Sequence, residues 1–194
     1  MLTVTHGLIV IDGIDLATLH PDKVRERLVT ISQTSFIMVG CTVRFNLDPT
    51  ENIPDADVIA ALERVGIWHG VLLERGGLNA EINDNLSPSR GEQQLLQLAR
   101  TMLKLEASNS KILLIDEDTS SVDMETDARI QDLLQQGPFR ACTILTAAHR
   151  VHTLLNYDLV IGLDRGKVVE VGQPAVLSKV KDGIFSTAHD SNRS

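Results

Sequence analysis

The stretch from Lys111 to Asp123 constrains the fold of this chain more than any other part of it. It begins with four consecutive aliphatic residues, Ile112 to Ile115. A short unbroken apolar run is typical of a strand buried on both faces, as in a parallel sheet. Two adjacent acids follow directly, Asp116 and Glu117. Because ligands of open α/β sheets bind beyond the carboxyl ends of the strands, this pattern predicts two carboxylates at the mouth of a site.

Paired acids at such a position suit the chemistry of nucleotide hydrolysis. The first acid can hold Mg²⁺ and the second can act on a water molecule, which is the Walker B arrangement. A core strand followed by a solvated acidic turn would give a similar pair. The sequence Thr-Ser-Ser-Val-Asp that ends at Asp123 favours the nucleotide interpretation.

Predicted strands and helices alternate along the chain, which indicates an α/β fold. We expect strands at residues 8–11, 28–31, 112–115 and 142–146, the last of them buried, and a hairpin formed by 158–163 and 167–171. We expect helices at 22–27, 55–65, about 91–104, 125–135 and 151–155, and one more after Pro174. Residues 39–46 are predicted to be irregular, and residues 76–85 to be a loop.

The amino-acid composition and net charge argue against some kinds of binding partner. The chain has 194 residues, of which 43% are hydrophobic, enough for one domain with a core. Its net charge of −8 without a basic block argues against nucleic acid and anionic membranes as partners. No window reaches the about 18 apolar residues of a membrane span, so we expect a soluble, cytoplasmic chain. Cys41 and Cys142 are interpreted as packing residues.

Five segments together carry a resemblance to a known family. They are Val29–Gln33, Gly40–Pro49, Asp116–Glu117, Ser121–Asp123 and Thr146–Arg150. In that order they resemble the Q-loop, the "GTVRxNLDP" stretch behind it, Walker B, the D-loop and the switch histidine. Over roughly residues 7 to 185 the chain resembles the nucleotide-binding domain of ABC transporters, most closely the second such domain of the multidrug-resistance-associated (C) subfamily.

This resemblance implies a fold and a domain organisation. The fold would be α/β and P-loop NTPase-like (ABC ATPase), with a mostly parallel sheet and an α-helical signature subdomain. Residues 1–194 would be a partial nucleotide-binding domain, with the helical subdomain at about 50–105 inserted in the α/β core. The first strand, loop and helix of the family's sheet would be missing.

The resemblance also implies roles for individual residues, with ATP and Mg²⁺ as cofactors. Asp116 and Gln33 would hold Mg²⁺, and Glu117 would orient or deprotonate the attacking water. His149 would hydrogen-bond the γ-phosphate. The remaining nucleotide contacts would come from Gln33, Ser89, Gly91, Glu92 and Asp123.

The signature segment departs from the family pattern LSxGQ. Counting back from the following helix aligns Ser89-Arg90-Gly91-Glu92-Gln93, with Pro88 in place of the leucine. Counting from the preceding loop makes Ser87 the signature serine, with two residues inserted. Either serine would stand at a helix N-terminus, where free N–H groups attract phosphate. We favour Ser89, because Gly91 would let the backbone approach phosphate closely.

No G-x-x-x-x-G-K-[ST] motif occurs in the chain. We therefore expect a fragment of the ATP-binding and ATP-hydrolysing module of an ABC-type exporter, inactive by itself. Its partners would be a second nucleotide-binding domain and transmembrane domains, at the cytosolic face of a membrane. A non-catalytic remnant or a regulatory, dimerising half-domain is the alternative. A soluble ATPase of the chromosome-maintenance type would need heptad runs, which the sequence lacks.

Overall fold

A computed structural model describes residues 6–32, 36–84, 86–117, 123–148, 151–181 and 183–191. The chain divides into two compact units, Met1–Thr146 and Ala147–Ser194. Among the described residues, no helix combines the length and the apolar character needed to cross a membrane.

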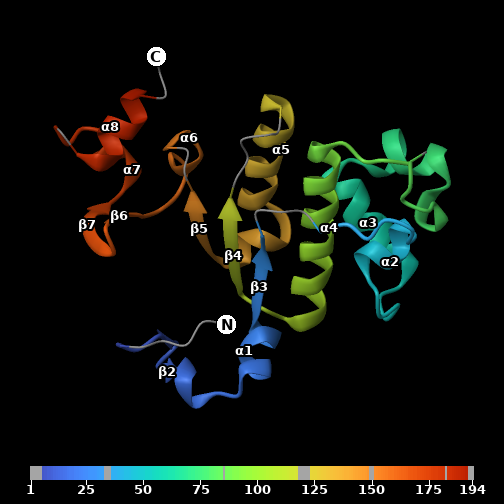
Figure 1. Cartoon of the computed structure of the whole chain (residues 1–194), viewed down its shortest axis with the longest axis horizontal. Coiled ribbons are helices and arrows are strands. Elements are labelled where there is room, and N and C mark those ends of the chain that lie inside the picture. The colour runs from blue at the N-terminus through green and yellow to red at the C-terminus, as the bar shows by residue number, and fades with distance from the viewer. Residues whose placement is uncertain are drawn as a thin grey trace. The chain divides into compact units, whose positions relative to one another are not determined.

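A three-stranded sheet forms the centre of the first unit, in the order β3 (Leu28–Ile31), β4 (Ile112–Glu117), β5 (Thr143–Ala148). β3 and β4 are parallel, with Leu28 paired to Ile112 and Ile31 to Ile115. The three arrows point the same way in Figure 1. The predicted parallel sheet with the aliphatic run in its central strand is therefore confirmed.

The prediction that β5 is a buried strand is wrong. Its residues alternate between exposed and half-buried, and the side chain of Leu145 is 57% exposed. β5 lies at an edge of the described sheet. Ile144 packs against the core, while its neighbour Leu145, on the other face of the strand, is exposed. An apolar run alone does not distinguish a central strand from an edge strand.

Two long helices, α4 (Arg90–Ser108) and α5 (Met124–Gln135), lie beside each other on the same side of β4 in the view of Figure 1. The shorter helices of this unit are α1 (Pro21–Arg27), α2 (Val43–Leu47) and α3 (Asp55–Val65). The single turns are a π turn at Trp68–Leu72 and 3₁₀ turns at Leu16–Thr18, Leu73–Arg75, Gly77–Asn79 and Gly137–Ala141. A small antiparallel pair, β1 (Val10–Ile11) and β2 (Ile14–Asp15), lies near the start.

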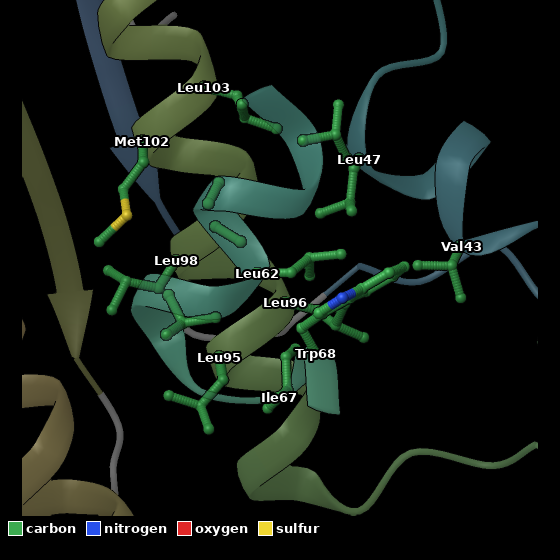
Figure 2. Close-up of a cluster of buried hydrophobic side chains, with 14 of the residues drawn as sticks. Val43, Leu47, Leu62, Ile67, Trp68, Leu95, Leu96, Leu98, Met102 and Leu103 are labelled. Atoms are coloured by element: carbon green, nitrogen blue, oxygen red, sulfur yellow. The ribbon is translucent and has the colours of Figure 1, made fainter. Parts of the chain in front are cut away.

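The main core of this unit lies between α4 and α3. Leu95, Leu96, Leu98, Met102 and Leu103 of α4 are all buried, at helical spacing. In Figure 2, Leu96 and Leu103 lie on the side of Leu62, Trp68 and Leu47, while Leu98 and Met102 point to the opposite side of α4. One face of α4 thus packs toward the sheet, and the opposite face packs toward the shorter helices.

The second unit has its own small core. It contains α6 (Val151–Leu154), β6 (Val160–Asp164), β7 (Lys167–Gly172), α7 (Pro174–Leu177) and α8 (Ile184–Ser191). β6 and β7 form the predicted hairpin, which is confirmed. The buried side chains of Val160, Leu177 and Phe185 hold its elements together.

Candidate functional site

The carboxyl end of β4 carries the predicted acidic pair. Asp116 is exposed there, and Glu117 ends the strand, although the side chain of Glu117 is outside the described part. Because Ile31 pairs with Ile115, the following residues Ser32 and Asp116 reach the same edge of the sheet. Gln33, the next predicted ligand, lies outside the described residues, and so does His149. The structure therefore places one predicted site side chain, Asp116, at this edge.

Asp116 has the chemistry that a magnesium site requires. Mg²⁺ binds oxygen ligands, usually one or two carboxylates together with waters and phosphate oxygens. An exposed carboxylate at a strand end fits that role. In the part of the chain that the structure describes, no cluster of three or more His, Cys, Asp or Glu side chains could hold a metal alone.

Ser89 is the N-cap residue of α4. Its hydroxyl oxygen accepts a hydrogen bond from the Glu92 backbone N–H at 3.2 Å, and its own N–H donates to the Glu92 carboxylate at 2.7 Å. This reciprocal pair is a capping box, which satisfies two of the donors that a helix start leaves free. The helix thus begins after Ser89, while Ser87 lies two residues before the cap.

The cap leaves chemistry available at this helix end. A serine hydroxyl has one proton to donate besides its acceptor lone pairs, so capping does not use up Ser89. Ser89 is exposed, and α4 is 19 residues long. The helix dipole therefore favours an anion near Ser89. The Glu92 carboxylate already places a negative charge there.

Asp123 caps α5 in a similar way. One carboxylate oxygen accepts the Thr126 backbone N–H and the other accepts the Thr126 hydroxyl, each at 2.9 Å. These hydrogen bonds, the backbone one first, lower the pKa of Asp123 below its usual value. The N-termini of α4 and α5 also meet each other: a Cβ on Gly91 would lie 3.2 Å from Thr126. We call Ser89–Glu92 and Asp123–Thr126 the paired helix ends.

Two side chains of α4 that the sequence did not single out donate hydrogen bonds to backbone carbonyls in residues 32–46. Gln97 donates from its side-chain amide to the Ser32 carbonyl at 3.2 Å. Arg100 donates to the Phe36 carbonyl at 3.0 Å and to the Asn46 carbonyl at 2.6 Å. Burial lowers the pKa of Arg100 from its ordinary value. Their spacing of one helical turn is the only sequence signal, and it is common in solvated helix faces.

Comparison with known proteins places these features in a family. A family model described as ABC transporter matches residues 1–120. ATP-binding cassette sub-family C member 2 of Homo sapiens is 38% identical over 194 residues, which covers 98% of this chain and 12% of that protein. ABC transporter ecdL of Aspergillus rugulosus is 41% identical over 187 residues, covering 96% of this chain and 12% of that protein.

ABC multidrug transporter B of Aspergillus fumigatus is 35% identical over 192 residues, covering 99% of this chain and 13% of that protein. The chain thus spans only 12% to 13% of the length of these relatives. Its resemblance to the C subfamily is confirmed, together with the P-loop NTPase fold. The chain belongs to the ABC transporter family, as part of a nucleotide-binding domain.

Proposed function

We propose that this chain supplies the signature of one composite ATP site and the Walker B acids of a second such site in an ABC-type exporter. The observation that carries the proposal is the pair of helix ends, where the exposed caps Ser89 and Asp123 stand on helices that touch at Gly91. Two adjacent helix N-termini bring the positive ends of two helix dipoles to one region, which suits recognition of a terminal phosphate. Ser89 would donate its hydroxyl proton to that phosphate.

The carboxyl edge of β4 would supply the metal and water chemistry of the second site. In this proposal Asp116 and Gln33 hold Mg²⁺, which neutralises phosphate charge when bound. Glu117 orients or deprotonates the attacking water, and His149 hydrogen-bonds the γ-phosphate. The exposure of Asp116 at the strand end supports this assignment.

The phosphate-cradling loop would come from outside these 194 residues, because they contain no G-x-x-x-x-G-K-[ST] motif. The proposed partners are a second nucleotide-binding domain with that motif and transmembrane domains, which place the chain at the cytosolic face of a membrane. Residues of about 50–105, which include α3 and most of α4, would form the helical subdomain. We expect the chain alone to bind MgATP weakly, since the nested N–H groups and lysine of that loop make most phosphate contacts.

The test is nucleotide-dependent association. The chain is mixed with a purified ABC nucleotide-binding domain that carries an intact G-x-x-x-x-G-K-[ST] motif, and the complex is measured by sedimentation with MgATP, MgADP or no nucleotide. We expect association with MgATP only. Ser89→Ala should weaken it by about tenfold or more, the loss of one hydrogen bond to a charged group.

Ser87→Ala is the matched control, because Ser87 is also exposed and lies two residues before the cap. An equal or larger loss in Ser87→Ala would show that the insertion alignment is right and the assignment of Ser89 is wrong. Association that is absent with every nucleotide would contradict the proposed function and favour the non-catalytic remnant.

A further inference from the structure

We propose that Thr126 is a positioning residue that sets the spacing of the paired helix ends, and that Gly91 is a glycine because Thr126 occupies the adjoining space. A Cβ on Gly91 would lie 3.2 Å from both Cγ2 and Oγ1 of Thr126. That distance is tighter than ordinary van der Waals contact, so the Thr126 side chain would have to shift by a few tenths of an ångström to accept even one methyl group. The missing side chain of Gly91 thus points toward α5.

Thr126 also controls the other helix end. Its N–H and its hydroxyl both donate to the Asp123 carboxylate, each at 2.9 Å. A β-branched threonine has few χ1 choices, and two bonds to one carboxylate fix it further. One side chain therefore links the cap of α5 to the first turn of α4. Any shift of Thr126 moves Asp123 relative to Ser89.

A second contact on the same face of α5 supports this arrangement. Arg129 follows Thr126 by three residues, so the two side chains lie on one face of the helix. The Arg129 guanidinium occupies the space that a side chain at Gly66 would need, at the C-terminus of α3. A cation is favourable at a helix C-terminus. α5 is thus in contact with both α3 and α4 through glycines that leave room for its side chains.

The functional consequence rests on the proposed function. If Ser89 and Asp123 both face a partner domain, their separation decides whether the two can engage it together. An alternative explanation of Gly91 is that phosphate must approach its backbone. The two explanations differ in one respect: only the spacing explanation allows a change at Thr126 to compensate for a side chain at residue 91.

The experiment adds a methyl group on one side of the contact between Gly91 and Thr126 and removes a methyl group from the other side. Gly91→Ala adds a methyl on α4, and Thr126→Ser removes the facing Cγ2 while keeping the hydroxyl that bonds to Asp123. MgATP-dependent association of the full chain with the same P-loop domain is measured for both single variants and for the double variant. We expect Gly91→Ala to weaken association about tenfold and the double variant to recover part of that loss, since the hydroxyl oxygen 3.2 Å from the added Cβ remains. Gly70→Ala is the matched control, since nothing lies within 4 Å of a Cβ there.

A double variant that is as weak as Gly91→Ala would overturn the inference and leave the phosphate explanation, while the proposed function would stand. If the unchanged chain does not associate at all, the proposed function fails but the inference is still decided by urea unfolding of the same four chains. In that experiment Gly91→Ala should lower the folding equilibrium constant of the unchanged chain. The factor by which it lowers this constant should be about fivefold smaller in a chain that also carries Thr126→Ser. Equal costs in both backgrounds would overturn the spacing role.

Discussion

Replacing Asp48 with asparagine should lower the free energy of unfolding by about 2–4 kcal/mol, although the two side chains have the same shape. The Asp48 carboxylate is 5% exposed and accepts four hydrogen bonds. They come from the Thr50 N–H at 3.2 Å, the Thr50 hydroxyl at 2.6 Å, the Ile53 N–H at 2.8 Å and the Arg44 guanidinium at 3.3 Å. This cluster closes the turn between α2 and α3.

The magnitude follows from counting acceptors. An asparagine has one side-chain oxygen, which can serve either the Thr50 donors or Ile53 and Arg44, while its NH₂ group faces the other pair. Leaving a buried donor without an acceptor costs about 1–3 kcal/mol. Arg44 keeps its bonds to Asp55 and to the Ile53 carbonyl, so its share is at the low end. The sum for the two lost bonds is therefore about 2–4 kcal/mol.

The effect should also depend on pH. Burial alone would raise the pKa of Asp48, but hydrogen bonds from Thr50, Ile53 and Arg44 outweigh it and lower the pKa from 3.8 to about 2. A carboxyl with a lowered pKa in the folded state stabilises the fold above its unfolded pKa and loses this contribution as the pH falls through the folded value. The shift corresponds to about 1–2 kcal/mol once solvent screening is allowed for. The difference in free energy of unfolding between the starting chain and Asp48→Asn should thus shrink from about pH 5 toward about pH 2.

Urea unfolding followed by circular dichroism measures both effects. Asp57→Asn makes the same chemical change at an exposed position in the first turn of α3, where about 0.5 kcal/mol is expected from the helix dipole. A loss in Asp48→Asn no larger than that in Asp57→Asn would refute the acceptor count. A difference that stays constant down to about pH 2 would refute the assignment of the pH dependence to Asp48.

Two further predictions concern the proposed site. Glu92→Gln keeps both bonds of the capping box but removes a charge, so MgATP-dependent association should strengthen by about threefold to tenfold at low salt and by less at high salt. Unchanged affinity at all salt concentrations would show that Glu92 is remote from phosphate. In an assembly that hydrolyses ATP, Glu117→Gln and His149→Ala should each reduce turnover by about a hundredfold or more while nucleotide binding persists. Normal steady-state phosphate release in either variant would show that its residue takes no part in the mechanism.

Local patterns that make strong, specific interactions were predictable from the sequence. The unbroken run 112–115 became the central strand, because only a strand with covered faces accommodates it. The Ser89 and Glu92 spacing marks a capping box, and α4 starts there. The β6–β7 hairpin turns at Arg165 and Gly166, which both have positive φ, as its Asp-Arg-Gly sequence allows.

Short elements and edges were less predictable. The irregular segment expected at residues 39–46 is partly wrong, because α2 begins at Val43, with Thr42 as its N-cap. A helix of five residues is too short to show a repeating apolar face. Its order depends on tertiary bonds instead: the side chain of Asn46 bonds to the carbonyls of Met38 and Thr42.

The features of the candidate site also differ in whether the sequence alone could predict them. Each cap could be predicted by itself, because a capping residue acts within three positions of the chain. The contact between Gly91 and Thr126 could not, since the two residues lie on different helices and neither type signals the other. The same holds for Arg100 and the Phe36 carbonyl. Sequence patterns thus give the components of this site, while their relative placement depends on packing between α3, α4 and α5.

Glu92 shows how stability and binding compete at the paired helix ends. Its carboxylate accepts the Ser89 N–H and sits at the positive end of the α4 dipole, so it stabilises the helix start. A bound phosphate would seek the same dipole and the same N–H groups, and would be repelled by that charge. A glutamine would keep the hydrogen bond without the repulsion. The acidic residue therefore holds α4 in place before a ligand arrives, so the strength of phosphate binding at Ser89 should depend on this charge together with that of Asp123, whose carboxylate lies at the adjoining helix end.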